Sequence, residues 1–335
     1  MSDMPIIEIK SVSMRFTKPV DLAGKIANLM GAKNKAEVVQ AVSDVSLAIR
    51  PGEVVGLVGE SGCGKSTLGR MVAGIYEPTE GQILYQGADL RTVTGARRQT
   101  ANLDVQMIFQ DPMASLNPRM RVREIIGEAP LFHQITSKEE LDDYVASILQ
   151  RVGLDPVFMR RYPHQFSGGQ RARIGIARAL AVKPKFLVCD ESVAALDVSI
   201  QAQVLNLFMQ LRQDLNLTYL FISHDLGVVK YLSDRVVIMY LGRVVESAPA
   251  KTIFAGPNHP YSKALLENVP TLAHRHKRFS SIKGEIPSPL SPPNGCHFHP
   301  RCPNAGPRCR QEVPLLRELE GGHFSACHLN DGGCE

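Results

Sequence analysis

The sequence lacks any apolar run long enough to cross a bilayer. Its most apolar stretches, residues 54–58, 186–189 and 219–222, are far shorter than the roughly 20 residues that a membrane-spanning helix needs. The first eight residues include Asp3 and Glu8 and do not follow the basic-then-apolar pattern of a secretory leader. We therefore expect a protein of the cytosol, whatever it docks onto.

A strong charge of one sign and internal repeats are missing as well. The net charge is only +5 over 335 residues, which suits phosphate ligands or an anionic surface without distinguishing between them. Hydrophobic residues make up 44% and charged residues 21%, a globular rather than a disordered composition. The length allows one large domain with an appendage, or two modest domains.

Strand and helix patterns alternate along most of the chain, with one helical interruption. This rhythm predicts an α/β core within residues 1–256, carrying a helical subdomain at about 112–165. A basic insert at 17–41, with weak helical periodicity, separates the first two strands. The expected strands are 6–16, 44–49, 53–58, 82–85, 105–109, 186–189, 218–222 and 235–240, and the expected helices are 65–73, 121–132, 138–152, 168–181 and 199–215.

A phosphate-binding loop follows the strand at 53–58. Residues 59–67, GESGCGKST, match the pattern G-x-x-x-x-G-K-[ST], whose glycines let successive backbone N–H groups face one anion. Lys65 should contact the β- and γ-phosphates of a nucleotide, and the Ser66 hydroxyl should ligate Mg²⁺. The alternative, a glycine-rich turn that only links a strand to a helix, is disfavoured by the flanking elements. The predicted nucleotide contacts in this loop are Gly59, Glu60, Ser61, Gly62, Cys63, Gly64, Lys65, Ser66 and Thr67.

Two adjacent carboxylates end the apolar strand FLVCDE at 186–191. Side chains alternate across a strand, so Asp190 and Glu191 should have different tasks. Asp190 would hold Mg²⁺, and Glu191 could polarise an attacking water. Exposed acids at a strand end are the alternative, which the phosphate loop upstream disfavours.

Two further polar residues indicate a function only because the phosphate loop and the two carboxylates are also present. His224 follows the strand at 218–222 and could reach the γ-phosphate, although a lone histidine there is usually a capping or surface residue. Gln110 follows the strand at 105–109 and could contact Mg²⁺ or the water, and signal to the helical subdomain.

The segment FSGGQRARIGIARAL at 166–180 predicts a second anion site. Ser167, Gly168 and Gly169 should start a helix with bare N–H groups and no side-chain cover. Two such loops meet one γ-phosphate if a head-to-tail dimer presents this segment to the partner's nucleotide. A plain helix cap is the alternative, and it would leave Gln170 unexplained.

Together these residues resemble the ABC ATPase family over about residues 6–256. The resemblance implies that Glu191 and His224 are catalytic, that Ser66, Gln110 and Asp190 hold Mg²⁺, and that Phe16 stacks on adenine, a core phenylalanine being the alternative. Two positions depart from the family pattern: Ser192 and Ala194 replace a proline and a serine or threonine. The matching segments are 59–67 (Walker A), Gln110 (Q-loop), 166–170 with Ser167, Gly168, Gly169 and Gln170 (signature), 186–191 (Walker B), 194–197 with Asp197 (D-loop) and His224 (H-loop).

Within that family the chain is most similar to the oligopeptide/dipeptide importer ATPases. The similarity rests on QDPMASLNPRM at 110–120, HPYSKALL at 259–266 and the tail GCHFHPRCP. It implies Mg²⁺ and ATP as cofactors and a peripheral location at the cytoplasmic face of the inner membrane. The implied partners are a second, related cassette in a heterodimer, two transmembrane permease subunits and, indirectly, an extracytoplasmic solute-binding protein. No nucleic acid is expected, although a soluble ABC ATPase acting on ribosomes or DNA stays an alternative, as does import of nickel chelates or other small solutes.

The C-terminal extension, 257–335, is expected to hold a metal centre. Its spacing, C-x5-C-x6-C-x17-C, lacks the tight C-x2-C pairs of zinc sites and suits an iron–sulfur cluster. The resemblance implies [4Fe-4S], and Zn²⁺ with His297, His299 or His328 in place of a thiolate is the alternative. The segment 284–309 is rich in Pro, Gly and Cys, so ligation should supply the stability that a small core cannot. The proposed ligands are Cys296, Cys302, Cys309 and Cys327, with Cys334 as a spare.

Overall fold

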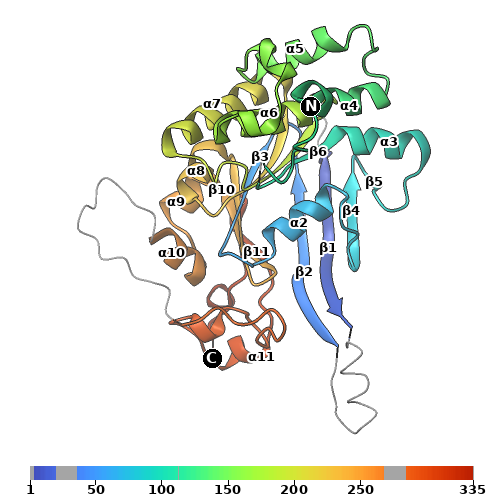
Figure 1. Ribbon diagram of the computed structural model, residues 1–335. Helices are drawn as coiled ribbons and strands as arrows, with labels where there is room; N and C mark the ends of the chain where they lie inside the picture. The colour runs from blue at the N-terminus through green and yellow to red at the C-terminus, as the bar shows by residue number, and fades with distance from the viewer. Residues whose placement is uncertain (1–3, 20–35, 112, 268–283, 335) are drawn as a thin grey trace, which may run out of the picture.

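Two β-sheets form the frame of the molecule in the computed structural model, which describes residues 4–19, 36–111, 113–267 and 284–334. The larger sheet has eight strands in the order β11-β12-β10-β9-β3-β8-β7-β6, and the smaller has four in the order β2-β1-β4-β5. Figure 1 shows the smaller sheet beside the main one, with helices above and the C-terminal extension below. The strands are β1 (Ile7–Lys18), β2 (Glu37–Ile49), β3 (Val54–Val58), β4 (Glu80–Tyr85), β5 (Ala88–Asp89), β6 (Val105–Ile108), β7 (Phe186–Asp190), β8 (Thr218–Ile222), β9 (Arg235–Tyr240), β10 (Arg243–Pro249), β11 (Arg317–Glu320) and β12 (His323–Ser325).

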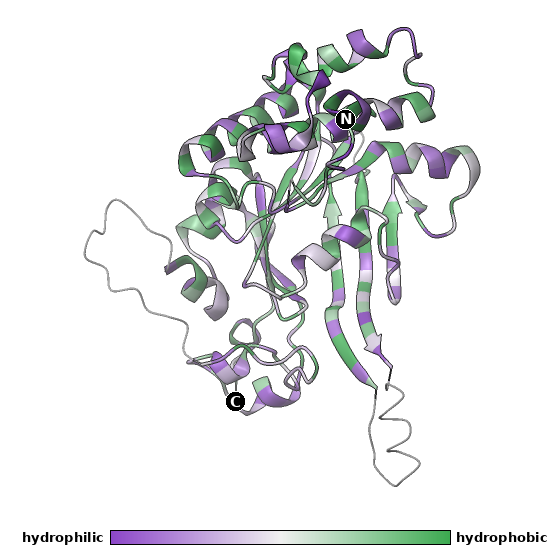
Figure 2. Cartoon of the chain, viewed as in Figure 1, coloured by the Kyte–Doolittle hydropathy of each residue, from purple (hydrophilic) through white to green (hydrophobic). Residues whose placement is uncertain are grey.

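Parallel pairing brings the carboxyl ends of the central strands to one edge. Strand β3 pairs in parallel with both β8 and β9, and β7 lies in parallel between β6 and β8. Every residue of β3, β7 and β8 is buried, as their unbroken apolar sequences predict. Figure 2 shows these hydrophobic stretches along the central strands. The loops that follow these strands therefore meet at one place.

The helices agree with the predicted rhythm and add to it. The expected helices at 65–73, 121–132, 138–152, 168–181 and 199–215 are each present within a few residues. In the described residues, no helix is both long enough and apolar enough to span a membrane. The helices are α2 (Lys65–Val72), α3 (Gly95–Asp104), α4 (Val122–Phe132), α5 (Leu141–Arg151), α6 (Gly168–Leu180), α7 (Val198–Leu215), α8 (Leu226–Leu232), α9 (Ala250–Ala255), α10 (Pro260–Glu267) and α11 (Pro307–Gln311).

Part of the basic insert proved to be strand. The expected helical periodicity of 17–41 rests on Leu22, Ile26 and Leu29, which lie outside the described residues. Residues 37–43 continue β2, whose register with β1 extends to Glu37 opposite Lys18. Long antiparallel pairing with β1 overrides the weak helical pattern there.

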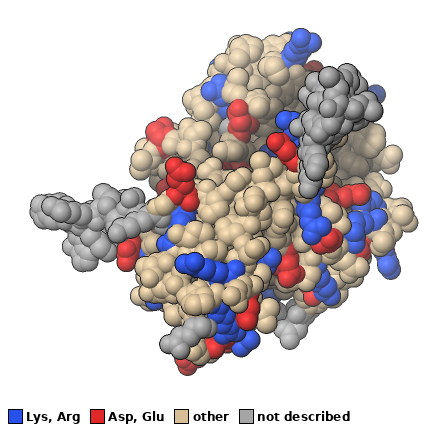
Figure 3. All heavy atoms as spheres, turned by 90° about the horizontal axis from the view of Figure 1, so that it is seen from below, with Lys and Arg blue, Asp and Glu red and all other residues tan. Residues whose placement is uncertain are grey.

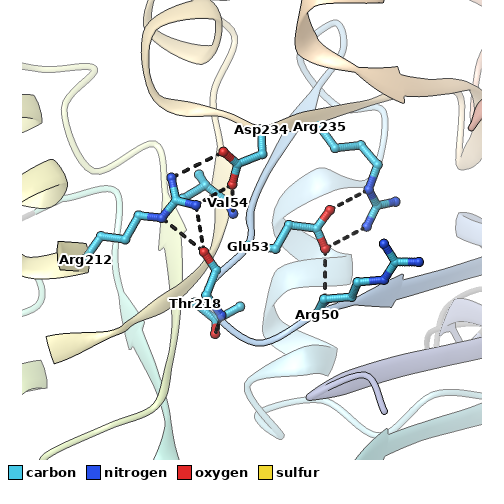
Figure 4. A network of polar contacts seen from close by, with 8 residues as sticks. Arg50, Glu53, Val54, Arg212, Thr218, Asp234 and Arg235 are labelled. Carbon is cyan, nitrogen blue, oxygen red and sulfur yellow. Dashed lines mark hydrogen bonds and ion pairs between the residues drawn. The ribbon is translucent and has the colours of Figure 1, made fainter. Parts of the chain in front are cut away.

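A polar network fixes the start of β3, at the opposite end from the phosphate loop. Arg235 pairs with Glu53, and Arg212 of α7 pairs with Asp234 while also donating to the carbonyl of Gly52. Asp234 in turn accepts the backbone N–H of Val54 at 2.8 Å (Figure 4). These contacts tie the starts of β3 and β9 to each other and to helix α7.

The C-terminal extension continues the main sheet instead of standing apart. Strand β12 pairs antiparallel with β10, and β11 pairs with β12. The rings of Tyr261 and Phe298 pack on Tyr240 of β9, with centroids 4.7 and 5.2 Å from that ring. Composition predicted a segment too poor in apolar residues to fold alone, and the structure supplies the missing packing from β9 and β10. The boundary at residue 256 stays a prediction.

The end of the molecule that carries this extension has mixed charge. Seen from below, Lys and Arg lie among Asp and Glu around a broad uncharged area (Figure 3). The described residues on that face therefore form no continuous basic surface.

Candidate functional site

The phosphate loop between β3 and α2 adopts a conformation that only glycine allows. Gly59 and Gly64 have φ of 154° and 103°, and a Cβ on them would lie 2.2 Å from the carbonyl oxygen of Met239 and 2.1 Å from that of Ala41. Gly64 is the N-cap of α2 and provides no side-chain cap. The first turn of α2 therefore points uncapped N–H groups at the loop, as an anion site requires.

Lys65 lies folded over its own loop. Its buried ammonium donates to the carbonyl oxygens of Gly59 and Glu60 at 2.8 and 3.0 Å. Ser61 and Gly62 are exposed at the rim, whereas Cys63 is buried and its pKa is raised by that burial. Cys63 thus packs as a small, mostly apolar residue, whose sulfur accepts only a long contact from the Lys65 ammonium at 3.8 Å.

Two oxygen atoms suited to Mg²⁺ face each other at the start of α2 and the end of β7. The Ser66 hydroxyl donates to Asp190 Oδ1 at 2.7 Å. Asp190 is almost fully buried, and this burial raises its pKa. A divalent cation would offset the cost of burying the carboxylate, so this pair fits a magnesium ion.

The Glu191 carboxylate contacts two of the other predicted site residues, Gln110 and His224. Its Oε2 accepts from the Gln110 amide at 2.8 Å and lies 3.3 Å from His224 Nδ1. The backbone N–H of Glu191 donates to the carbonyl of Ile222, which ties the end of β7 to the loop that carries His224. Glu191 has φ of 45°, a strained conformation for a non-glycine residue. Side chains from three parallel strand ends thus converge on one carboxylate.

The signature segment starts α6, and the amide of Gln170 at this helix start is covered by a side chain. Ser167 Oγ accepts the backbone N–H of Gln170 at 3.3 Å, and Gln170 Oε1 accepts the N–H of Ser167 at 3.0 Å. This is a capping box, so the expectation of no side-chain cover is wrong, and the cap explains Gln170 as well. Close packing explains the glycine at position 169, because a Cβ there would lie 2.3 Å from Ile200 Cγ2 of α7.

Nothing in the described part of the chain joins the signature residues to their own phosphate loop by a hydrogen bond or ion pair.

Asp197, the predicted D-loop residue, caps α7 by accepting the N–H of Ile200 at 3.0 Å. The next residue, Val198, is 83% exposed. Ser192, where the family pattern has proline, has a buried hydroxyl without a hydrogen-bond partner.

Phe16 lies on β1, away from any packed core. Its ring is 38% exposed and stands edge-on to Tyr76, with centroids 5.7 Å apart. The alternative of a core phenylalanine is therefore wrong. Stacking of this ring on adenine stays a prediction.

Five cysteines of the C-terminal extension line one small pocket. Burial raises the pKa of Cys296 to about 12, and it also raises the pKa of Cys302 and Cys327. His328, in the same pocket, donates from Nε2 to a backbone carbonyl and has a buried Nδ1 without a partner. Among the described residues, no three His, Cys, Asp or Glu side chains are grouped closely enough to hold a single metal ion. The pocket is lined by Cys296, Cys302, Cys309, Cys327 and Cys334, with His259, His299 and His328.

Two residues that touch the phosphate loop were missed from the sequence. Arg301 pairs with the Glu60 carboxylate, and the Tyr261 hydroxyl accepts the backbone N–H of Glu60 at 3.0 Å. That N–H, predicted to face phosphate, is thus used by the extension. The motif HPYSKALL includes Tyr261 but gives no sign of this contact, because Glu60 is 201 residues away.

Family models match two parts of the chain. The model described as "ABC transporter" matches residues 42–194, which contain the phosphate loop, Gln110 and Glu191. The model described as "Oligopeptide/dipeptide transporter, C-terminal region" matches residues 245–309.

Whole-chain relatives point the same way. The oligopeptide transport ATP-binding protein AppF of Bacillus subtilis is 51% identical over 87% of this chain and 90% of its own. The putative oligopeptide transport ATP-binding protein YkfD of the same organism is 49% identical over 98% of this chain and 97% of its own. The probable peptide ABC transporter ATP-binding protein y4tS of Sinorhizobium fredii is 46% identical over 89% and 84%.

Solved structures resemble the cassette part. The ATP-binding cassette MJ0796, a dimer bound to ADP and phosphate after hydrolysis, superposes with a TM-score of 0.61 at 26% identity, over 73% of this chain and 98% of its own. The cbiO1 subunit of an ABC transporter complex from Clostridium perfringens gives a TM-score of 0.61 at 25% identity, over 76% and 92%.

Proposed function

The chain belongs to the ATP-binding proteins of ABC transporters and is an ATP-hydrolysing transport subunit, and from this premise we propose how its residues divide the work. The observation that carries the assignment is the convergence on Glu191, whose one oxygen accepts from Gln110 and lies beside His224. Gln110 belongs to the loop that opens the helical subdomain, so it connects the reacting centre to that subdomain.

Glu191 acts as the base that orients and deprotonates the attacking water. Gln110 holds the carboxylate and the carbonyl of Ile222 holds the backbone N–H of Glu191, so the direction of the side chain is fixed before the nucleotide binds. His224 lies 3.3 Å from the same oxygen and is placed to contact the γ-phosphate. Magnesium held by Ser66 and Asp190 would neutralise charge on the β- and γ-phosphates.

Lys65 completes the phosphate contacts. With nucleotide bound, its ammonium would exchange the two loop carbonyls that it now contacts for phosphate oxygens. Phe16, whose ring is half exposed on β1, would stack on the adenine, and Thr67 would contact phosphate from the first turn of α2.

Replacing Glu191 by Gln tests this assignment. The variant should bind ATP normally and lose about 10²–10⁴-fold in turnover, because it keeps the shape of the side chain but cannot accept a proton. Glu320→Gln, the same change on the exposed strand β11, is the control and should hydrolyse ATP at the wild-type rate. Near-normal hydrolysis by Glu191→Gln would remove Glu191 from the catalytic role.

We propose further that two cassettes sandwich the nucleotide, each presenting α6 to the other's phosphate loop. Support comes from the signature segment, which has no bond to its own loop, and from the exposed Val198 next to Asp197. The partner is expected to be a related chain. Glu191→Gln with Mg-ATP should sediment as a dimer only when this partner is added, whereas dimers of the single chain would contradict the heterodimer.

Peptide import through two permease subunits is the transport function we propose, by analogy with the peptide relatives. The helical subdomain would receive the permeases at the cytoplasmic face of the membrane, and a solute-binding protein would act outside. Segment 112–135, which follows Gln110, is the predicted docking face. Of its apolar residues, Ile125 and Ile126 are buried, whereas Phe132 is 80% exposed. Crosslinks from a cysteine at position 132 to a permease subunit would support this face, and crosslinks confined to the C-terminal extension would exclude it.

The cysteine pocket is proposed to hold a [4Fe-4S] cluster. Four thiols of the predicted set lie around one pocket, and burial raises the pKa of three of them, Cys296, Cys302 and Cys327. A single zinc ion needs ligands about 2.3 Å from one point, whereas a four-iron cluster takes thiolates spread around a larger core. The C-x5-C-x6-C-x17-C pattern and the shared pocket support the cluster, and Zn²⁺ stays the alternative.

Anaerobic purification tests the cluster directly. The protein should absorb broadly near 400 nm and contain about four irons per chain. Cys302→Ser should lose most of the iron, whereas Cys189→Ser, a buried cysteine of β7, should keep it. A colourless protein with one zinc per chain would overturn the cluster.

A further inference from the structure

Two side chains of the C-terminal extension form hydrogen bonds with one residue of the phosphate loop, Glu60. The Arg301 guanidinium donates from Nη1 and Nη2 to the two carboxylate oxygens of Glu60, at 2.7 and 3.1 Å. The Tyr261 hydroxyl accepts the backbone N–H of Glu60 at 3.0 Å. Both the side chain and the backbone of Glu60 are thereby held from outside the loop.

Glu60 in turn contacts Lys65, so the hydrogen bonds from the extension connect to the phosphate-binding lysine. The carbonyl oxygen of Glu60 accepts from the Lys65 ammonium at 3.0 Å and from the backbone N–H of Cys63 at 3.3 Å. A shift of Glu60 would therefore move the carbonyl oxygen to which the Lys65 ammonium donates. The chain of contacts runs from the extension to the group that meets the nucleotide.

This ion pair is built to be strong. The Arg301 side chain is only 4% exposed, and its two parallel hydrogen bonds match the planar guanidinium to the carboxylate. The Tyr240 hydroxyl accepts a further bond from Nη1 at 3.3 Å, and the ring lies against the guanidinium. Burial makes such a pair costly to break from one side, because the remaining charge is left without a partner.

We propose that Arg301 and Tyr261 are positioning residues for the phosphate loop, through which the C-terminal extension sets the affinity for nucleotide. They hold Glu60 in place, and with it the loop backbone from which the Lys65 ammonium turns to the phosphates. Arg301 is followed directly by Cys302 of the cysteine pocket, so the pocket and the phosphate loop share one short segment of chain. The inference rests on ATP binding by the cassette and does not depend on what the cysteine pocket holds.

A purely structural role would have a different signature. If Arg301 only pinned the extension to the cassette, its loss would lower the stability of the protein and leave the affinity of the folded fraction unchanged. The proposal requires instead a change in affinity that is transmitted through Glu60.

The test is a double-mutant cycle on the full chain, read as the dissociation constant of Mg-ADP by calorimetry. Arg301→Gln and Glu60→Gln should each weaken binding on the order of tenfold, within the range of coupling between sites in proteins. The double variant should be no weaker than either single variant, because both changes break the same link. Arg301→Lys should lie between wild type and Arg301→Gln, since it keeps the charge but loses the fork.

Arg308→Gln is the matched control. Arg308 belongs to the same extension and pairs with Glu312 on the surface, without contact to the phosphate loop, so its loss should leave the dissociation constant unchanged. Tyr261→Phe offers a second route if Arg301→Gln fails to fold, because it deletes one hydroxyl and keeps the ring packed on Tyr240 and Phe298. An unchanged dissociation constant in folded Arg301→Gln or Tyr261→Phe, or strictly additive effects in the cycle, would overturn the proposal.

Discussion

Acid should weaken the fold through His259, an imidazole buried at the start of α10. Its Nδ1 accepts the backbone N–H of Tyr261 at 3.1 Å, and the backbone N–H of His259 donates to the buried carboxylate of Glu246 at 2.9 Å. Burial, with a smaller contribution from nearby Lys263, lowers the pKa of His259 to about 3. The imidazole therefore stays neutral in the folded protein at every pH near neutrality.

The sign of the effect follows from comparing the two states. An unfolded histidine takes up a proton below about pH 6.5, so between that pH and about 3 the unfolded chain binds more protons than the folded one. The stability linked to His259 is complete above pH 6.5 and is lost as the pH falls. At pH 5 the loss is about 2 kcal/mol, from 1.36 kcal/mol for each of about 1.5 pH units.

The measurement is the urea midpoint at pH 7 and pH 5. His259→Asn should show a smaller drop than wild type, because the amide oxygen can still accept the N–H of Tyr261 but does not titrate. His164→Asn removes an exposed imidazole and should reproduce the wild-type drop. Equal drops in wild type and His259→Asn would refute the account.

Two glycine substitutions test how closely the backbone packs around the nucleotide site. Gly64→Ala should abolish ATP binding, as measured by calorimetry, because the new methyl group would meet the Ala41 carbonyl in a loop whose φ disfavours alanine. Gly169→Ala should lower the urea midpoint, because overpacking against Ile200 costs about 1–3 kcal/mol and the better helix propensity returns only about 0.5–1 kcal/mol. In an Ile200→Ala background the same change should become stabilising, and destabilisation there would contradict the packing explanation.

The nucleotide site could be assembled from the sequence because parallel strands impose it. Asp190, Gln110 and His224 each follow an apolar strand, and parallel strands place their carboxyl ends at one edge. The contact of Ser66 with Asp190 was implied by assigning both residues to one Mg²⁺, because a shared ion brings its ligands together.

Side-chain capping was harder to foresee. The glycines at the start of α6 suggested open amides, yet Ser167 and Gln170 stand three residues apart and satisfy each other. The pattern S-x-x-Q was present in the sequence and carries its own local explanation.

Long-range contacts of the extension left no local signal. Strand β12 is only three residues long, and its partner β10 precedes it by more than 70 residues. Likewise, nothing near Arg301 identifies Glu60 as its partner, since an arginine beside cysteines suits many surfaces. Such pairings depend on the assembled fold and not on periodicity.

The pairing of β12 with β10 also decides what the main sheet presents to other molecules. Without the extension, β10 would be an edge strand with a row of unpaired backbone groups, an open template for a strand from another chain. The extension moves the edge outward to β11, a short strand of sequence RELE with every residue exposed and three of four charged. Charged side chains on a short edge strand oppose pairing with a foreign strand. Strands β11 and β12 therefore protect the cassette against strand-to-strand aggregation, and a chain cut after α9 would expose β10.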